Sequence, residues 1–222
     1  MIYIFGFGYV HQTQDLIAGG TDTSAKTVEW AMSELLNQPH LIQKAIEELD
    51  GVIGRERWVE EKDIPQLPYI DAIMKETMRK HPVVVLLAPH LALEDCDVAG
   101  YKICEGTRVF VNAWSIGRDP SLWDAPEDHF YPDRFLGKDI DVKGQYFGLL
   151  PFGSGRRMCP GYSLGLKMIS SSLANLLHGF EWKLPDNVKP GDLSMEEVYG
   201  LSTPRKSPLV AVLKPRLPLH LY

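Results

Sequence analysis

The stretch PFGSGRRMCPG, residues 151–161, constrains the fold and chemistry of this chain more than any other segment. It places Cys159 among glycines, just before a segment with apolar residues at helical spacing, 162–179. Glycines at 153, 155 and 161 permit positive φ angles and let a large group approach the backbone. A cysteine before a helix lies in the positive field of the helix N-terminus, which favours the thiolate. Two interpretations are open: a thiolate that reacts or binds metal, or a buried cysteine in a glycine turn.

Composition narrows the class of protein. The chain has 222 residues, 45% hydrophobic and 23% charged, which is typical of a soluble globular protein. Its net charge of −6 predicts no nucleic-acid partner. The three cysteines, Cys96, Cys104 and Cys159, lack paired spacing, which predicts a reducing compartment without a disulfide framework. No CxxC or CxxH partner lies near Cys159, so a single thiolate suits haem iron better than tetrahedral zinc.

The remaining pattern predicts one mainly α domain with a minor β part. Periodicity and prolines predict helices at 12–36, 40–51, 69–80 and 162–179. The stretch 91–114 alternates and is broken by glycines, which predicts a β-hairpin, and the tail holds a strand candidate at 207–215. Residues 117–137, rich in proline and aromatic residues, predict an irregular packed segment.

Two polar motifs lie on the predicted helices. In GGTDTS, residues 19–24, two glycines cost a helix about 1 kcal/mol each relative to alanine, which suggests that a group comes close to the backbone. A threonine hydroxyl there can bond the carbonyl one turn earlier and open a kink. The alternative is a flexible kink with a solvated Asp22. In ETMR, Glu76 and Arg79 share a helix face, and the alternative to a functional pair is an ordinary surface ion pair.

Taken together, these motifs resemble the cytochrome P-450 family of haem-thiolate monooxygenases. FGSGRRMCPG, 152–161, matches the family pattern Phe-x-x-Gly-x-Arg-x-Cys-x-Gly, and GGTDTS, ETMR and FYPDRF agree in order and rough spacing. The resemblance implies the C-terminal part of that fold, from the oxygen-binding helix through the cysteine loop to the C-terminal strands. It also implies haem b, with its iron bound by the Cys159 thiolate.

The resemblance assigns further residues to the cofactor and the reaction. Phe152 would pack beside the ligand, and Arg157 and His90 would meet haem propionates. The remaining cofactor contacts implied are backbone approaches at Gly20, Gly153 and Gly161. Thr23 would donate a hydrogen bond to iron-bound oxygen, and Asp22 would take part in the proton relay. His90 has a simple alternative, a strand histidine.

A buried charge triad is also implied. The family reading joins Glu76 and Arg79 to Arg134 in FYPDRF, where Asp133 stands in place of the usual glutamate. The triad would lock the loop that carries Cys159, in a structural rather than a catalytic role.

The implied substrate is a lipophilic small molecule. The segments 83–87 and 199–203 match regions that line the substrate pocket in the family, and their apolar character supports this. The implied pocket residues are Ala18, Val83, Val84, Leu86, Leu201 and Ser202.

The segment NAWSIGRDP, 112–120, resembles the plant microsomal branch, and the nearest groups are flavonoid 3′-hydroxylases and homoterpene-forming enzymes. The implied function inserts one oxygen atom from O₂ into a plant secondary metabolite. Electrons would come from NADPH through a cytochrome reductase, at the cytosolic face of the endoplasmic reticulum. The alternative is a truncated, non-catalytic member that binds haem poorly or not at all.

The resemblance covers only the C-terminal part of the family pattern. Residues 12–222 are expected to form a partial haem domain, and residues 1–11 an atypical start. MIYIFGFGYV is apolar but too short to span a bilayer, so no transmembrane anchor is expected in this chain. Without an anchor, the expected location is cytoplasmic.

Overall fold

A computed structural model describes the backbone of residues 3–123 and 129–222, and side chains from residue 14 onward outside the 124–128 gap. Residues 1–2 of the expected atypical start and 124–128 of the expected irregular segment lie outside the described residues. The described parts are mainly helical with three small antiparallel sheets, which confirms the predicted fold class.

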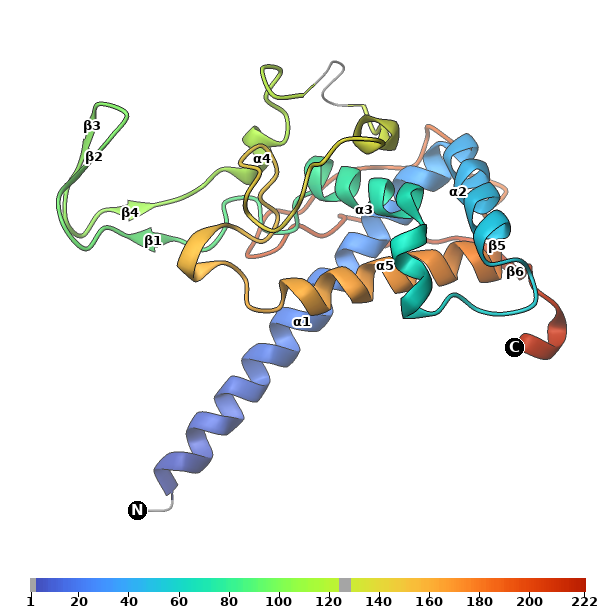
Figure 1. Ribbon diagram of the computed structural model, residues 1–222, viewed down its shortest axis with the longest axis horizontal. Helices are drawn as coiled ribbons and strands as arrows, with labels where there is room; N and C mark the ends of the chain where they lie inside the picture. The colour runs from blue at the N-terminus through green and yellow to red at the C-terminus, as the bar shows by residue number, and fades with distance from the viewer. Residues whose placement is uncertain (1–2, 124–128) are drawn as a thin grey trace.

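The described residues form five α-helices (Figure 1). Their bounds are α1 Tyr3–Asn37, α2 Pro39–Val52, α3 Pro68–Lys80, α4 Ala113–Ile116 and α5 Tyr162–Gly179. Proline stands in the first turn of α2 and α3, where its missing N–H costs no hydrogen bond. Four short 3₁₀ helices are η1 Glu61–Gln66, η2 Pro132–Phe135, η3 Gly155–Arg157 and η4 Leu219–Leu221.

Helix α1 is longer than the sequence predicted, since it begins at Tyr3 rather than at residue 12. Its C-terminal part packs against α2, α3 and α5, and a helix anchored in this way extends at little cost because each added residue gains one hydrogen bond. In Figure 1 the N-terminal part of α1 projects from the body as a rod. The side chains of residues 14–22 are all exposed.

The strands form three two-stranded sheets. They are β1 His90–Leu91 with β4 Arg108–Val109, β2 Cys96–Val98 with β3 Tyr101–Ile103, and β5 Phe180–Lys183 with β6 Val212–Pro215. The predicted hairpin turns at Ala99 and Gly100, which have φ of +52° and +84°. A two-residue turn with positive φ at both positions matches the twist of its strands.

The core consists of two clusters of buried apolar side chains. The larger joins the C-terminal part of α1 to α2, α3 and α5, with Leu35, Leu49, Ile70, Leu173 and Leu177 fully buried. The smaller joins α3 and α5 to the segment that leads into the cysteine loop, through Met74, Trp123, Phe135, Leu149 and Ile169. The cysteine loop therefore rests on packed core. No described helix has both the length and the apolar character needed to cross a membrane.

The C-terminal segment is tied to the core by Arg216. Its guanidinium donates to the Asp50 carboxylate at 3.0 and 2.7 Å and to the His178 carbonyl at 2.8 Å. The His178 ring, fully buried in α5, lies 3.0 Å from the Arg57 carbonyl through Nε2. Burial lowers the pKa of His178 below its usual 6.5, and the Arg216 charge lowers it further.

We expect acid to weaken this fold through His178. The unfolded histidine gains a proton as pH falls through about 6.5, whereas the folded one resists protonation, so the free energy of unfolding falls below that pH. Urea denaturation at several pH values between 7.5 and 5.5 measures the slope. His178→Gln keeps a donor for the Arg57 carbonyl but removes the titration, and should flatten the slope. An equal slope in both proteins would contradict the assignment.

Candidate functional site

The cysteine loop is closed by backbone and side-chain hydrogen bonds. The Cys159 N–H donates to the Phe152 carbonyl at 2.9 Å, and the Ser154 hydroxyl donates to the Gly144 carbonyl at 2.6 Å. Gly153 and Gly155 both have φ of +74°, a conformation that other residues rarely adopt. The glycines are therefore required by the path of the loop.

Cys159 is exposed, so the alternative of a buried cysteine in a glycine turn is wrong. It lies two residues before Gly161, the N-cap of α5. A Cβ added at Gly161 would stand 3.9 Å from the Cys159 sulfur, and one added at Gly155 would meet nothing within 4 Å. An open sulfur beside glycines fits a large, flat group bound through a thiolate, so these residues fit haem.

The neighbours of Cys159 on the loop divide between core and surface. Phe152 is half-buried and contacts the Tyr162 ring edge-on, with 6.4 Å between ring centroids. A Cβ added at Gly165 would lie 3.6 Å from the Phe152 ring, so this ring packs against α5. Arg157 lies in η3 with its side chain exposed, as does Arg156.

Glu76, Arg79 and Arg134 form one buried network, so the alternative of a surface ion pair is wrong. Arg79 donates to the two Glu76 carboxylate oxygens at 2.7 and 2.8 Å. Arg134 donates from Nε to the same carboxylate at 3.1 Å. The Tyr131 N–H adds a further bond to Glu76 at 2.7 Å. Glu76 and Arg79 are fully buried, and Arg134 is 5% exposed.

The two arginines carry the network further into the chain. Arg79 donates to the Gly117 carbonyl at 2.6 Å, and both arginines donate to the His129 carbonyl, at 3.1 and 3.2 Å. The network thus holds α3, Gly117 and the start of the segment 129–135 in fixed positions.

The GGTDTS motif lies on the exposed part of α1. The Thr23 hydroxyl donates to the Gly19 carbonyl at 2.8 Å, one turn earlier, while the α-helix continues without interruption. A Cβ added at Gly19 or Gly20 would meet nothing within 4 Å in this chain. The predicted close approach therefore involves no described part of this chain.

A polar cluster joins Asp22 on α1 to the segment 199–203. Lys26 forms an ion pair with Asp22 and also donates to the Ser202 hydroxyl at 2.6 Å. Sequence reasoning named Asp22 and Ser202 but missed Lys26. The i, i+4 spacing of Asp22 and Lys26 was the signal that could have found it.

The two predicted substrate segments lie together. The Thr203 N–H donates to the Val83 carbonyl at 2.8 Å. Val83 and Val84 are half-buried, whereas Leu86 and Leu201 are exposed. Ala18 is exposed on α1, and His90 is exposed on β1. Within the described part of the chain, no hydrogen bond or ion pair joins Cys159 to Thr23 or His90.

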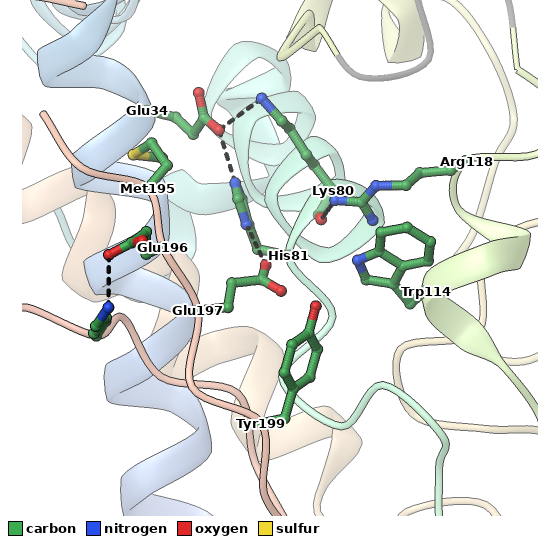
Figure 2. A pocket seen from close by; sticks show the side chains of 10 residues that line it. Glu34, Lys80, His81, Trp114, Arg118, Met195, Glu196, Glu197 and Tyr199 are labelled. Carbon is green, nitrogen blue, oxygen red and sulfur yellow. Dashed lines mark hydrogen bonds and ion pairs between the residues drawn. The ribbon is translucent and has the colours of Figure 1, made fainter. Parts of the chain in front are cut away.

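A pocket of about 530 Å³ lies between the ends of α1 and α3, helix α4 and the segment 195–206 (Figure 2). None of the residues that line it belongs to the cysteine loop. At its centre His81 reaches Glu34 through Nε2 at 2.7 Å and Glu197 through Nδ1 at 3.3 Å. The imidazole stacks on Trp30, with ring centroids 4.1 Å apart. No local pattern in the sequence indicates this cluster, because its members are widely separated along the chain.

Comparison with known proteins identifies the class. A family model for cytochrome P-450 matches residues 9–212, so the chain belongs to the cytochrome P-450 family. A zebra fish cytochrome P-450 structure with abiraterone superimposes with a TM-score of 0.81 and 31% identity, covering 91% of this chain and 47% of that one.

Curated relatives place the chain in the plant branch of the family, as the sequence predicted. A trimethyltridecatetraene synthase from Zea mays is 58% identical over 213 residues, which cover 94% of this chain and 38% of the relative. A flavonoid 3′,5′-hydroxylase from Crocosmia x crocosmiiflora is 45% identical over 207 residues, which cover 91% and 39%. The chain thus spans about two fifths of the length of these relatives.

We expect loss of Glu76 to destabilise the chain strongly. Glu76→Ala leaves two buried guanidinium groups without their carboxylate, at a cost of about 3–5 kcal/mol in the free energy of unfolding. Chemical denaturation measures the loss. Lys62→Ala removes an exposed ion pair with Glu60 and serves as the control, with an unchanged midpoint. A Glu76→Ala midpoint equal to that of the control would refute a supporting role for the network.

Proposed function

We propose that this chain is the haem-thiolate part of a monooxygenase that inserts one oxygen atom from O₂ into a lipophilic plant metabolite. One observation carries the proposal: an exposed cysteine in a glycine-lined loop at the N-terminus of α5. Membership of the cytochrome P-450 family supports it. In this proposal residues 12–222 form part of a haem domain.

Haem bound through a thiolate would supply the reductive activation of O₂, which a thiolate ligand favours. Cys159 would hold the iron, with Phe152 packed between the loop and α5. Arg157 and His90, both at the surface, would meet the propionates. Gly20, Gly153 and Gly161 would leave room for the ring, and Gly161 does so beside the sulfur.

The helix α1 would supply the proton-handling groups. The half-buried Thr23 hydroxyl donates its proton to the Gly19 carbonyl at 2.8 Å, and in this proposal it would turn from that carbonyl to donate a hydrogen bond to O₂ at the haem site. Asp22, on the same exposed stretch, would hold and pass a proton. Glu76, Arg79 and Arg134 would support the loop without touching the reacting atoms.

The proposed substrate is a lipophilic secondary metabolite. The exposed side chains of Leu86 and Leu201 and the half-buried Val83 and Val84 offer an apolar surface, beside Ala18 and Ser202. The names of the plant relatives, a homoterpene synthase and a flavonoid hydroxylase, support this class. Electrons would come from NADPH through a reductase at the cytosolic face of the endoplasmic reticulum, with Arg156 on the docking face.

A second candidate is a non-catalytic family member that binds haem poorly. The observation that favours it is the exposed apolar surface of α1 and α5, at Leu16, Ile17, Leu164 and Met168. Such a surface binds partners or aggregates. This candidate predicts a broad thermal transition, binding of the dye ANS and no NADPH-coupled oxidation with added reductase.

We expect haem-supplemented protein, once reduced and saturated with carbon monoxide, to show a Soret band at the position typical of the family, because that band reports a thiolate ligand. Cys159→Ser should abolish it. Cys96→Ser and Cys104→Ser, which alter the other exposed cysteines, are the matched controls and should keep it. Absence of the band in the unaltered protein would defeat the proposal and favour the second candidate.

We also expect Arg157 to hold haem more strongly than its neighbour does. Arg157→Gln removes a charge that would pair with a propionate, so haem should transfer faster to apomyoglobin. Arg156→Gln changes the same exposed 3₁₀ turn and is the control. Equal transfer rates in the two variants would reject the propionate role of Arg157.

A further inference from the structure

Lys26 connects helix α1 to the C-terminal segment 199–203. Its ammonium forms an ion pair with Asp22, one turn earlier on the helix, and donates to the Ser202 hydroxyl at 2.6 Å. The Ser202 hydroxyl in turn donates to the same Asp22 oxygen, Oδ2, at 3.4 Å. Three side chains from opposite ends of the sequence thus form a closed triangle.

The segment beyond this triangle is anchored to α1 and to Val83 through Thr203. The buried Trp30 donates from Nε1 to the Thr203 carbonyl at 3.0 Å, and the Thr203 N–H donates to Val83. On the other side, Leu201 is 94% exposed. Ser202 therefore stands at the boundary between the anchored and the exposed part of the segment, and it contacts α1 through Lys26 at 2.6 Å and through Asp22 at 3.4 Å.

The exposed fractions of the Lys26 and Asp22 side chains show that Lys26 is the more restricted of the two. The Lys26 side chain is 17% exposed, whereas that of Asp22 is 56% exposed. An exposed i, i+4 ion pair contributes little by itself, because water screens it and both side chains lose freedom. A cation that is also bonded to Ser202 is already positioned, so it restricts Asp22 more than a free lysine would.

We propose that Lys26 is a positioning residue that fixes the Asp22 carboxylate and couples its orientation to the segment 199–203. Both bonds from the triangle go to Oδ2 of Asp22. Oδ1 is then the carboxylate oxygen left for proton exchange. A lipophilic molecule that contacts Leu201 and displaces Ser202 breaks the bond between Ser202 and Lys26. Lys26 then no longer fixes the orientation of the Asp22 carboxylate. The link to proton delivery rests on the proposed function, whereas the coupling itself does not.

The chain offers a matched control for this lysine. Lys75 pairs with Asp71 at the same i, i+4 spacing on α3, at 2.8 Å, and its side chain is also 17% exposed. Lys26→Met and Lys75→Met therefore remove equivalent ion pairs. They differ in the contact with Ser202, which only Lys26 makes.

The coupling is tested on the full chain by NMR. Lys26→Met should speed hydrogen exchange of the Thr203 amide by about three- to tenfold, the loss expected for one charge-assisted bond near the surface, while Lys75→Met leaves it unchanged. Lys26→Arg, which keeps the charge and donors, should restore slow exchange. Equal exchange in both methionine variants would overturn the proposal.

A double-mutant cycle tests whether Asp22 responds to the segment. Ser202→Ala should shift the carboxyl carbon resonance of Asp22 more in the native background than in the Lys26→Met background, where only the direct 3.4 Å bond from Ser202 to Asp22 is lost. Equal shifts in both backgrounds, or none in either, would overturn the coupling.

The link to the reaction is measured separately. In haem-supplemented protein with reductase, Lys26→Met should lower the product formed per NADPH consumed, and Lys26→Arg should restore it. Unchanged product yield would reject the positioning role. Failure of the unaltered protein to bind haem would count against the proposed function alone, because the two NMR tests need no haem.

Discussion

Within the described part of the chain, hydrogen bonds from two arginines and one backbone amide converge on the carboxylate of Glu76, and they hold the segment against which the cysteine loop packs. The arginines are Arg79 and Arg134, and the amide is that of Tyr131. They fix the segment that ends in η2, whose Phe135 packs in the same apolar cluster as Leu149 and the half-buried Phe152. Because the Phe152 carbonyl accepts the Cys159 N–H, the charge network is connected to the sulfur through packing and one backbone bond.

The residues that support the cysteine loop differ in burial from the candidate site residues. Glu76, Arg79 and Arg134 are buried, with both arginines hydrogen-bonded to Glu76, whereas Cys159, Arg157 and His90 are exposed. Burial would have placed a thiol in apolar surroundings that disfavour its charged form, and would have blocked access to it.

Most helices and the hairpin could be predicted because their sequence signals are local. Prolines at helix starts, helical spacing in 162–179 and the turn at Gly100 each act within a few residues. The i, i+3 pair of Glu76 and Arg79 was also visible, but its burial depends on distant segments that cover it. The contacts of His81 with Glu34 and Glu197 had no local signal, because they join three separate parts of the chain.

The sequence by itself determined the family, the mainly helical fold and the identity of the cysteine loop, because glycine, proline and cysteine impose local conformations and chemistry wherever they stand. Only the tertiary structure decided that Cys159 is exposed, that the Glu76 pair is buried and that Lys26 reaches Ser202. Exposure and long-range contact are properties of packing, since they depend on which distant segments cover a residue. The i, i+4 spacing that pairs Lys26 with Asp22 was present in the sequence but was missed, and only the fold brought Ser202 to both.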